Sequence, residues 1–243
     1  MRASNEWAGY ADSFASLDEY THFLPHLFEL LGPLEGRRVL DLGCSNGVMS
    51  RLLASRGARL TGVDISEHAI AIAERLAGQS GSDIAYHLAD ARDLSRFGEA
   101  SFDQVLAVNT LCSFGSERNT LQAIIGEIHR VLAPGGTLVA VIPHPAFEHE
   151  QTCITRNRHF PEGYSYFDGG TTTTLHLRIG DSEAEFTNVH WTIEDYSRFF
   201  SGRFYIGQVR EPEPDETFDA VHPQMFARSA RYPIYMLLQC VRC

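Results

Sequence analysis

The sequence contains no lysine, and all 20 of its basic residues are arginine. Against these stand 31 acidic residues, which leave a formal net charge of −11 at pH 7. A surface of this sign repels phosphate backbones and anionic lipid headgroups. A small basic cluster at Arg156, Arg158 and His159 is a local exception. We therefore expect neither a nucleic acid nor a membrane as partner.

The sequence also lacks long apolar runs. The run at 137–142 is far shorter than the roughly 18 residues that suggest a membrane-spanning helix. Residues 1–14 show no basic start followed by an apolar stretch, so no secretory signal is predicted. We expect a cytoplasmic protein.

Cysteines are few, and the five present are an odd number. Without a signal peptide, reduced thiols are the expected state. Cys240 and Cys243 form one C-x-x-C, but a structural zinc site needs a second pair of ligands. We predict no metal site and place both cysteines in a last strand.

Apolar runs alternate with helical patterns between residues 37 and 143. Strands that are apolar on both sides and separated by helices indicate a parallel sheet covered on both faces. The expected strands are 38–42, 59–64, 84–90, 102–109 and 137–142, and the expected helices are 48–55, 66–76 and 121–132. Residues 17–31 resemble an amphipathic helix, which Pro25 would break or kink.

The alternation changes after Pro143. Residues 144–170 indicate a long loop, and 172–179 with 184–191 an antiparallel hairpin. A helix at 192–200, capped by Thr192, and closing strands at 203–209 and 233–241 complete the chain. The connection 211–232 is long enough to suggest a functional role.

The turn at 39–47, V-L-D-L-G-C-S-N-G, is the most informative stretch. Gly43 and Gly47 flank a strand-to-helix turn, where glycine lets the backbone approach a ligand closely. The spacing is G-x-x-x-G and not the G-x-G-x-x-G of dinucleotide enzymes. Asp41 would repel a pyrophosphate but attract an ammonium group. These features favour a cationic ligand over NAD.

A second acid, Asp64, ends the next strand within G-V-D-I. A carboxylate at that place accepts both hydroxyls of a ribose. Ile65 beside it is expected to pack on an adenine face.

Five elements in order resemble the motifs of class I S-adenosylmethionine-dependent methyltransferases: L-D-L-G-C-S-N-G, G-V-D-I-S, A-D-A-R-D-L, S-F-D-Q-V-L-A-V-N and R-V-L-A-P-G-G-T-L-V-A-V. The match spans about residues 37–143. It implies a three-layer Rossmann-like α/β fold whose mostly parallel seven-stranded sheet has an antiparallel last strand. It implies S-adenosylmethionine as cofactor and S-adenosylhomocysteine as product.

The resemblance also implies roles for individual residues. Asp41, Gly43 and Gly47 would surround the methionine moiety, and Cys44, Ser45 and Asn46 lie between those glycines. Ser45 stands where the commonest form of the family has a third glycine. Asp64 would hold the ribose, and the remaining positions are Asp90 for the adenine amino group with Ala91 beside it, and Asn109 near the sulfonium. Asp93 is an alternative to Asp90.

Two segments of the chain are expected to close the pocket. Residues 7–14 resemble the family's lid, in which Tyr10 or Phe14 covers the cofactor; a frayed terminus is the alternative. The insertion 144–191 is expected to form a roof over the pocket with its aromatic residues, which could equally make a satellite core or a dimer surface. Those aromatics are Phe147, Phe160, Tyr164, Tyr166 and Phe167.

His144 directly follows the fifth strand, so we expect it to point into the ligand crevice as a base or substrate anchor. Merely capping the strand end is the alternative. His149 and His190 are second candidates. Cys44 and Cys112 are expected to be small apolar fillers near the pocket and not nucleophiles.

The sequence thus predicts a single methyltransferase domain, 1–243. It would comprise a helical lid at 1–36, a cofactor-binding core at 37–143, a substrate roof at 144–191 and closing elements at 192–243. We expect methyl transfer to oxygen, nitrogen or carbon of a small molecule, in bacterial specialised metabolism, by a monomer or homodimer. The alternatives are a macromolecular acceptor, or a cofactor-binding protein without methyl transfer, acting as a partner subunit or cyclase.

Overall fold

The computed structural model describes residues 20–149, 156–179, 182–213 and 231–243. Its main sheet has seven strands in the order β3-β2-β1-β4-β5-β10-β9. They are β1 (Arg38–Leu42), β2 (Arg59–Asp64), β3 (Ala85–Leu88), β4 (Phe102–Val108), β5 (Leu132–Pro143), β9 (Phe204–Arg210) and β10 (Tyr235–Arg242). The pairs among β1 to β5 are parallel, and β10 runs antiparallel between β5 and β9. This topology confirms the predicted fold class.

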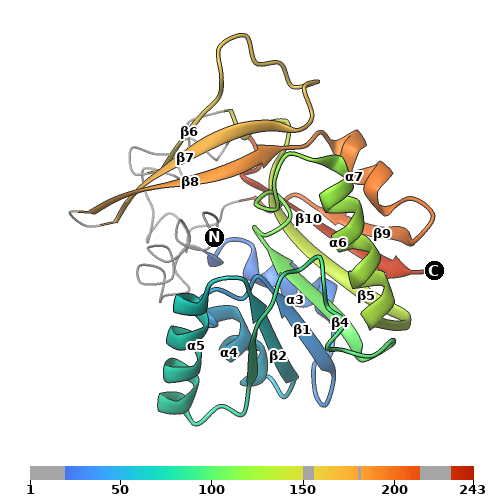
Figure 1. The fold of residues 1–243 in the computed structure, drawn as a ribbon. Helices are drawn as coiled ribbons and strands as arrows, with labels where there is room; N and C mark the ends of the chain where they lie inside the picture. The colour runs from blue at the N-terminus through green and yellow to red at the C-terminus, as the bar shows by residue number, and fades with distance from the viewer. Residues whose placement is uncertain (1–19, 150–155, 180–181, 214–230) are drawn as a thin grey trace.

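Alternating side chains of the central strands pack into two apolar layers, one on each face of the sheet. Leu40 of β1 packs in a cluster with the inner sides of α6 (Arg118–Val131) and α7 (Ile193–Phe200). Its neighbour Val39 packs in a second cluster with α3 (Leu24–Leu31) and α4 (Val48–Ala54). Because successive strand residues point to opposite faces, a strand apolar at both must be covered on both sides. Figure 1 shows the resulting three layers.

Several helix ends differ from prediction. The helix expected at 17–31 is an α-helix only from Leu24, and Pro25 lies in the first turn of α3, where no backbone N–H is needed. The helix α5 (Glu67–Ser80) runs through Gly78 and ends at Gly81, which has the left-handed φ of +67°. Ser66 caps its start, accepting from Ala69 N at 3.2 Å.

The strand expected at 137–142 begins earlier, at Leu132, so residues 134–136 lie inside β5. The pairing of β5 with β4 shifts register between Phe102 and Gln104. Such an irregularity absorbs extra residues without ending the strand.

A second sheet of three strands follows β5, in the order β6-β7-β8. The predicted hairpin is confirmed as β7 (Thr171–Ile179) and β8 (Ser182–His190). The segment predicted as loop contains a third strand, β6 (Arg156–His159), which pairs with β7. Its sequence R-N-R-H has no apolar alternation, so a pattern-based prediction misses it; backbone hydrogen bonds to β7 hold it instead.

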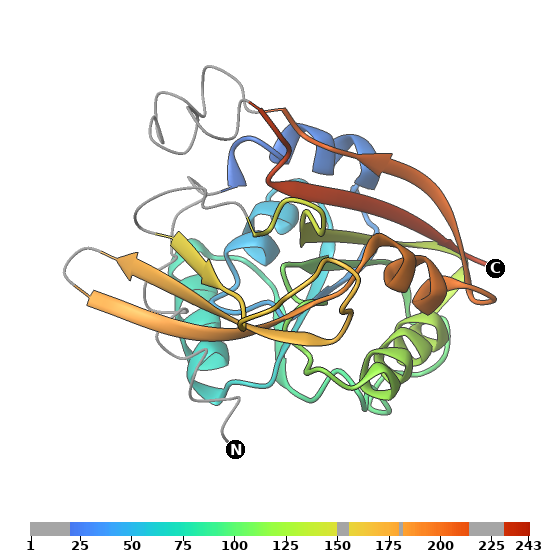
Figure 2. The same cartoon turned by 90° about the horizontal axis from the view of Figure 1, so that it is seen from above.

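This small sheet lies beside the end of the main sheet at which β2 and β4 finish (Figures 1 and 2). Val189 N of β8 donates to Cys112 O, in the loop after β4, at 2.7 Å. The hairpin is thereby attached next to the carboxyl ends of the parallel strands. Within the described ranges, no helix is both long and apolar enough to cross a membrane.

Candidate functional site

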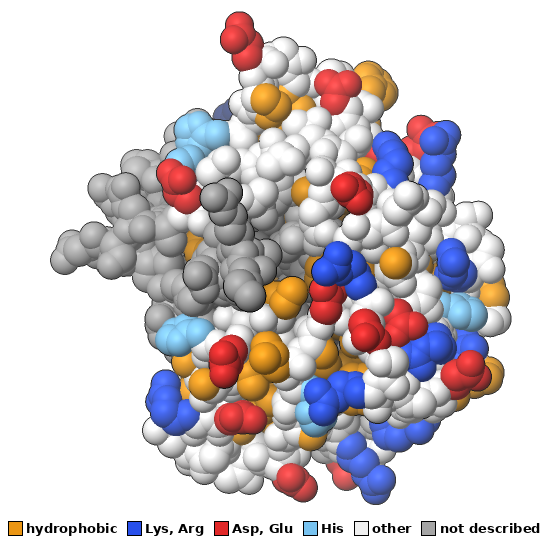
Figure 3. All heavy atoms as spheres, in the orientation of Figure 1, with side chains coloured by type: hydrophobic (Ala, Val, Ile, Leu, Met, Phe, Trp, Pro, Cys, Tyr) orange, Lys and Arg blue, Asp and Glu red, His pale blue; other side chains and the backbone are white. Residues whose placement is uncertain are grey.

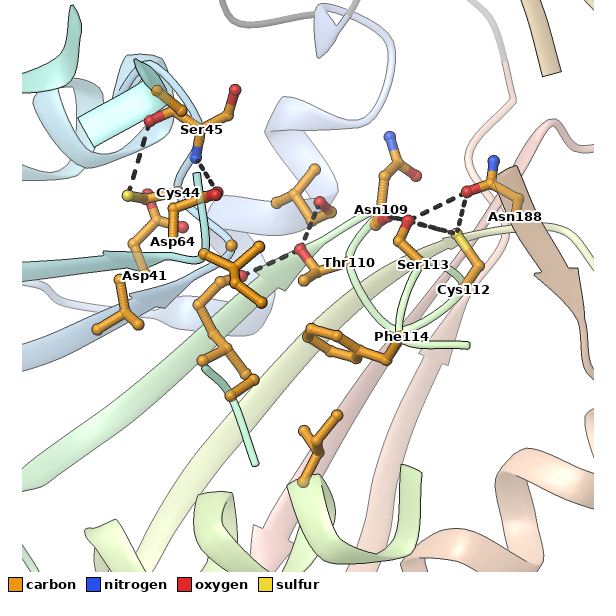
Figure 4. A pocket seen from close by; sticks show the side chains of 18 of the residues that line it. Asp41, Cys44, Ser45, Asp64, Asn109, Thr110, Cys112, Ser113, Phe114 and Asn188 are labelled. Carbon is orange, nitrogen blue, oxygen red and sulfur yellow. Dashed lines mark hydrogen bonds between the residues drawn. The ribbon is translucent and has the colours of Figure 1, made fainter. Parts of the chain in front are cut away.

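A cavity of about 510 Å³ opens at the carboxyl ends of β1, β2 and β4 (Figure 4). Its walls come from the turns after these strands, from α6 and from β7 and β8. The predicted cofactor residues that line it are Asp41, Gly43, Cys44, Ser45, Asn46, Asp64, Ile65, Asp90, Ala91 and Asn109. Gly47 caps α4 beside them, and Tyr10 lies outside the described residues. Strand ends separated by up to 68 positions in the chain thus meet at one cavity, as a parallel sheet requires.

The turn after β1 is tightly packed from behind. A Cβ on Gly43 would lie 2.4 Å from Thr110 Cγ2, and one on Gly47 would lie 2.3 Å from Tyr86 Oη. Both glycines have φ above +70°, and Ser45 between them has φ of +49°. The left-handed conformation at Ser45 explains why glycine suits this position. The turn therefore presents backbone to the cavity.

Asp41 is a buried acid at the end of β1. Its Oδ2 accepts a hydrogen bond of 2.6 Å from Ser50 Oγ. Burial raises its pKa to about 6, and the charge of Asp64 acts in the same direction. The Ser50 hydroxyl is neutral, so it does not balance a carboxylate. A cationic group bound in the cavity would balance the negative charge of Asp41.

Asp64 is held rigidly at the end of β2. One oxygen accepts from Ser66 N and the other from Ser45 N, both at 2.9 Å. Burial raises the pKa of Asp64, although these backbone bonds oppose the shift. Each carboxylate oxygen has a second lone pair, so the group can still accept two bonds from a ligand. Ile65 beside it is 43% exposed and lines the same cavity.

Asp90 and not Asp93 lines the cavity, which bears on the alternative left open by the sequence. The guanidinium of Arg92 binds Asp90 with Nη2 to Oδ2 at 2.5 Å. This hydrogen bond lowers the pKa of Asp90, so its carboxylate is charged at neutral pH. Ala91 is buried next to it.

Asn109 follows β4 with φ of +55°. Its backbone N–H donates to Val141 O at 2.8 Å. Its side-chain Oδ1 is buried and has no hydrogen-bond partner among the described residues. A buried acceptor without a partner is costly, so this atom marks a place for a ligand donor.

The side chain of His144 contacts other residues and does not line the cavity, where the sequence predicted it. Its Nε2 lies 2.7 Å from Glu211 Oε1, its Nδ1 accepts from Ala146 N, and its ring packs on Phe147. It is buried and is not among the residues that line the cavity. These contacts agree with the alternative that His144 caps the strand end, where its backbone N–H also donates to Ile234 O at 2.8 Å.

The other two histidines do not line the cavity either. His149 is exposed. His190 is completely buried, with Nδ1 bound to Glu148 and Nε2 at 2.7 Å from Tyr166 O. The catalytic roles of all three histidines stay predictions.

The five aromatics of the insertion are not among the cavity-lining residues. Tyr164 and Tyr166 pack their rings on His190, and Phe160 packs on Tyr164. Phe167 is 84% exposed. Phe167 nonetheless contacts the ring of Tyr166, so all five aromatics contact neighbouring rings, and strand residues of the insertion form the cavity wall instead.

The sequence patterns did not predict the side of the cavity that is formed by the loop after β4 and by β7 and β8. These residues are Thr110, Ser113 and Phe114 in the loop after β4, with Leu175 of β7 and Thr187, Asn188 and Val189 of β8. One signal existed in the sequence. Phe186, Asn188 and His190 alternate along one face of the strand, and the structure buries all three, so this face carries two buried polar side chains. Buried polar side chains in such a pattern indicate a hydrogen-bonded network.

Cys44 and Cys112 are buried free thiols at the cavity wall. Burial raises the pKa of each above its ordinary value. Both thiols stay protonated at neutral pH, which agrees with filler residues and not with nucleophiles.

Comparison with known proteins matches residues 40–140 to a family described as "Methyltransferase domain". A ubiquinone biosynthesis O-methyltransferase from Paracidovorax citrulli is 31% identical over 134 residues, which are 55% of each chain. The chain thus spans about half the length of the curated relatives it matches. Residues 40–140, which match the family, contain the glycine turn at 43–47, Asp64, Asp90 and Asn109.

Solved structures resemble the chain over most of its length. A putative S-adenosylmethionine-dependent methyltransferase from Listeria monocytogenes is 22% identical with a TM-score of 0.71, covering 93% of this chain and 98% of that one. The cyclase SpnF is 21% identical with a TM-score of 0.58, covering 92% and 80%. At such identities the likeness concerns the fold.

Proposed function

We propose that the chain is a class I S-adenosylmethionine-dependent methyltransferase that transfers a methyl group to a small molecule, because its fold and its match to a methyltransferase domain at 40–140 both support that family. The cofactor that this family implies is S-adenosylmethionine. The observation that supports the proposal most directly is the meeting of Asp41, Asp64 and the glycine turn at one cavity.

The cavity fits this cofactor. Its volume of about 510 Å³ lies within the range of small-molecule sites. The uncompensated carboxylate of Asp41 suits an ammonium group, and the rigid carboxylate of Asp64 suits the two hydroxyls of a ribose. We propose that the turn at 43–47 takes the methionine moiety, that Ile65, Asp90 and Ala91 take the adenine, and that Asn109 lies near the sulfonium.

When bound, S-adenosylmethionine supplies an electrophilic methyl group and becomes S-adenosylhomocysteine. The protein's own residues then hold cofactor and acceptor in line and keep water out. Such positioning contributes up to about 7–11 kcal/mol to a reaction between two bound partners. Asp64 is well placed for this task because two backbone bonds fix its carboxylate before any ligand arrives.

We propose a hydroxylated acceptor with an apolar body. Phe114, Leu175 and Val189 give the acceptor side of the cavity apolar walls, and the curated relatives are named as O-methyltransferases. Those names concern ubiquinone biosynthesis and not specialised metabolism, so the proposal stops at the chemical class. A base role for His144, His149 or His190 would be excluded for each histidine whose alanine variant keeps full turnover.

Isothermal titration with S-adenosylmethionine, S-adenosylhomocysteine and NAD tests the cofactor assignment. We expect the first two to bind the wild-type protein and NAD to fail. Asp64→Ala should lose at least about tenfold in affinity, since hydrogen bonds to a charged group are worth about 1.5–3 kcal/mol. Asp83→Ala, which removes an exposed carboxylate outside the cavity, is the matched control. Binding of NAD alone would overturn the proposal.

Formation of S-adenosylhomocysteine together with a methylated product separates methyl transfer from the cyclase-type alternative. A screen should contain hydroxylated aromatics, tRNA and a protein extract. A macromolecular acceptor would need an open groove with a basic rim. On the face in Figure 3, acidic and arginine side chains are interspersed, and the net charge is −11. Methylation of tRNA or protein alone would sink the small-molecule assignment.

A further inference from the structure

We propose that Ser113 and Asn109 form a subsite that accepts a hydrogen bond from the hydroxyl of the acceptor, and that Asn188 and Arg158 set its polarity. The inference rests on the proposed function and specifies the acceptor side of the same cavity. Ser113, Asn109 and Asn188 all line that cavity, and Figure 4 shows them close together, with Asn188 reaching in from β8.

The donors and acceptors around Asn188 select one orientation of its amide. Its nitrogen donates to Ser113 Oγ at 3.0 Å and to Thr187 O at 3.3 Å, and its oxygen accepts from Arg158 Nη2 at 3.2 Å. In the opposite orientation the amide nitrogen would face the cationic guanidinium. Arg158 therefore fixes which end of the amide reaches Ser113.

This orientation decides what Ser113 can offer the cavity. Its hydroxyl hydrogen is directed to Asn109 O at 3.2 Å, and one lone pair of Oγ takes the amide hydrogen of Asn188. One acceptor lone pair remains. Asn109 Oδ1, a buried acceptor without a partner in the described part of the chain, lies on the same wall. The subsite presents acceptors, so it suits a hydroxyl or N–H group and disfavours a carboxylate.

Arg158 is held in place by a buried ion cluster, which we define as Glu148, Arg158 and His190. Glu148 bridges the other two, binding Arg158 Nη1 through one oxygen and His190 Nδ1 through the other. The exposed fractions of the three side chains are 4%, 7% and 0%. His190 Nε2 donates to Tyr166 O, so both ring nitrogens face acceptors.

The cluster's charge state follows from these contacts. Burial lowers the pKa of His190, but the hydrogen bond and charge of Glu148 outweigh it, and the net shift is upward. Buried ion groups of this kind often stabilise a fold no better than apolar side chains of similar volume would. The role of this cluster is to orient Arg158. Glu148 holds Nη1 of the guanidinium, so the planar group can present Nη2 to Asn188 in only one way.

Two simple probes test the subsite: catechol, which has two hydroxyl donors, and 1,2-dimethoxybenzene, which has none. We expect ligand-observed NMR titration in the presence of S-adenosylhomocysteine to show that the wild-type protein binds catechol about tenfold more tightly than 1,2-dimethoxybenzene. A tenfold difference in affinity corresponds to about one good hydrogen bond. Ser113→Ala should reduce this preference to less than about threefold. Thr120→Ala, which removes a hydroxyl from the α6 side of the cavity, should keep it.

Asn188→Asp tests the positioning residue with almost no change in volume. An aspartate still accepts from Arg158 but cannot donate to Ser113, whose hydroxyl then turns toward it. Both lone pairs of Ser113 Oγ are then free to accept, so the preference for catechol should rise above the wild-type value, while the affinity for S-adenosylhomocysteine stays within about twofold.

Equal affinity of the two probes for the wild-type protein would overturn the inference, as would a preference that survives Ser113→Ala or that is lost in Asn188→Asp. Failure of the wild-type protein to bind S-adenosylhomocysteine would overturn the proposed function separately. The two results are distinguishable because the probes report the acceptor subsite and the nucleoside reports the cofactor site.

Discussion

Asp41 is a residue whose burial is hard to justify by stability alone. Folding raises its pKa from 3.8 to about 6, chiefly through desolvation. The folded state therefore holds this proton more tightly than the unfolded chain does. The contribution of Asp41 to stability is most favourable at low pH and becomes unfavourable as pH rises from about 4 to about 6. At pH 7 the cost is about 3 kcal/mol, which a ligand's positive charge would offset.

Asp41→Asn should consequently stabilise the ligand-free protein while weakening cofactor binding. We expect the free energy of unfolding in urea to rise at pH 7.5 by up to about 3 kcal/mol, because asparagine can keep accepting from Ser50. The gain should shrink as pH falls below about 6. The affinity for S-adenosylmethionine, measured by titration calorimetry, should drop at least about tenfold.

Asp83→Asn serves as control, because that carboxylate is exposed. Destabilisation by Asp41→Asn at every pH would mean that the acid has a structural role through Ser50. That result would remove the electrostatic argument for a cationic ligand.

At the scale of single elements, α7 connects the small sheet to the main one. Only two residues separate it from β8, and Thr192 and Asp195 form a reciprocal capping box at its start. Thr192 Oγ1 accepts from Asp195 N at 3.0 Å, and the Asp195 carboxylate accepts from Thr192 N at 3.1 Å. Asp195 also binds Arg118 at the start of α6. One helix end thus ties the insertion to the helical layer.

Thr192→Ala should cost about 1 kcal/mol of stability, since an orphan N–H at the helix start loses its acceptor. Thr192→Ser keeps a hydroxyl and should cost less than half as much. Urea denaturation followed by circular dichroism measures both. Equal losses in the two variants would show that the threonine methyl, and not the cap, stabilises α7.

Cofactor binding involves the whole molecule, because the cavity draws residues from β1, β2 and β4 and from the inserted sheet. A ligand that binds only the folded protein stabilises it by mass action, by about 2.7 kcal/mol at a concentration of 100 Kd. For a chain of this size each kcal/mol raises Tm by about 2–4 °C. We expect S-adenosylhomocysteine at that concentration to raise Tm by roughly 5–10 °C.

NAD should leave Tm unchanged, and Asp64→Ala should reduce the shift to about half or less at the same ligand concentration. Differential scanning fluorimetry reads all three conditions. A shift of similar size with NAD would contradict the cationic-ligand argument, because the phosphates of a dinucleotide would then be tolerated beside Asp41.

The sequence by itself determined the parallel sheet, the glycine turn and the positions of Asp41, Asp64 and Asn109. These features depend on short-range patterns: apolar runs make buried strands, and strand ends in a parallel sheet meet at one edge. The capping box of α7 is equally local, since Thr192 and Asp195 are three residues apart.

Only the tertiary structure decided the direction of His144, the existence of β6 and the acceptor wall of the cavity. His144 turns toward Glu211, a residue 67 positions later, which no local pattern encodes. The contact of Ser113 with Asn188 spans 75 positions. Such contacts arise because packing of the inserted sheet brings polar groups into a place where each buried donor needs an acceptor, and that requirement acts in space and not along the chain.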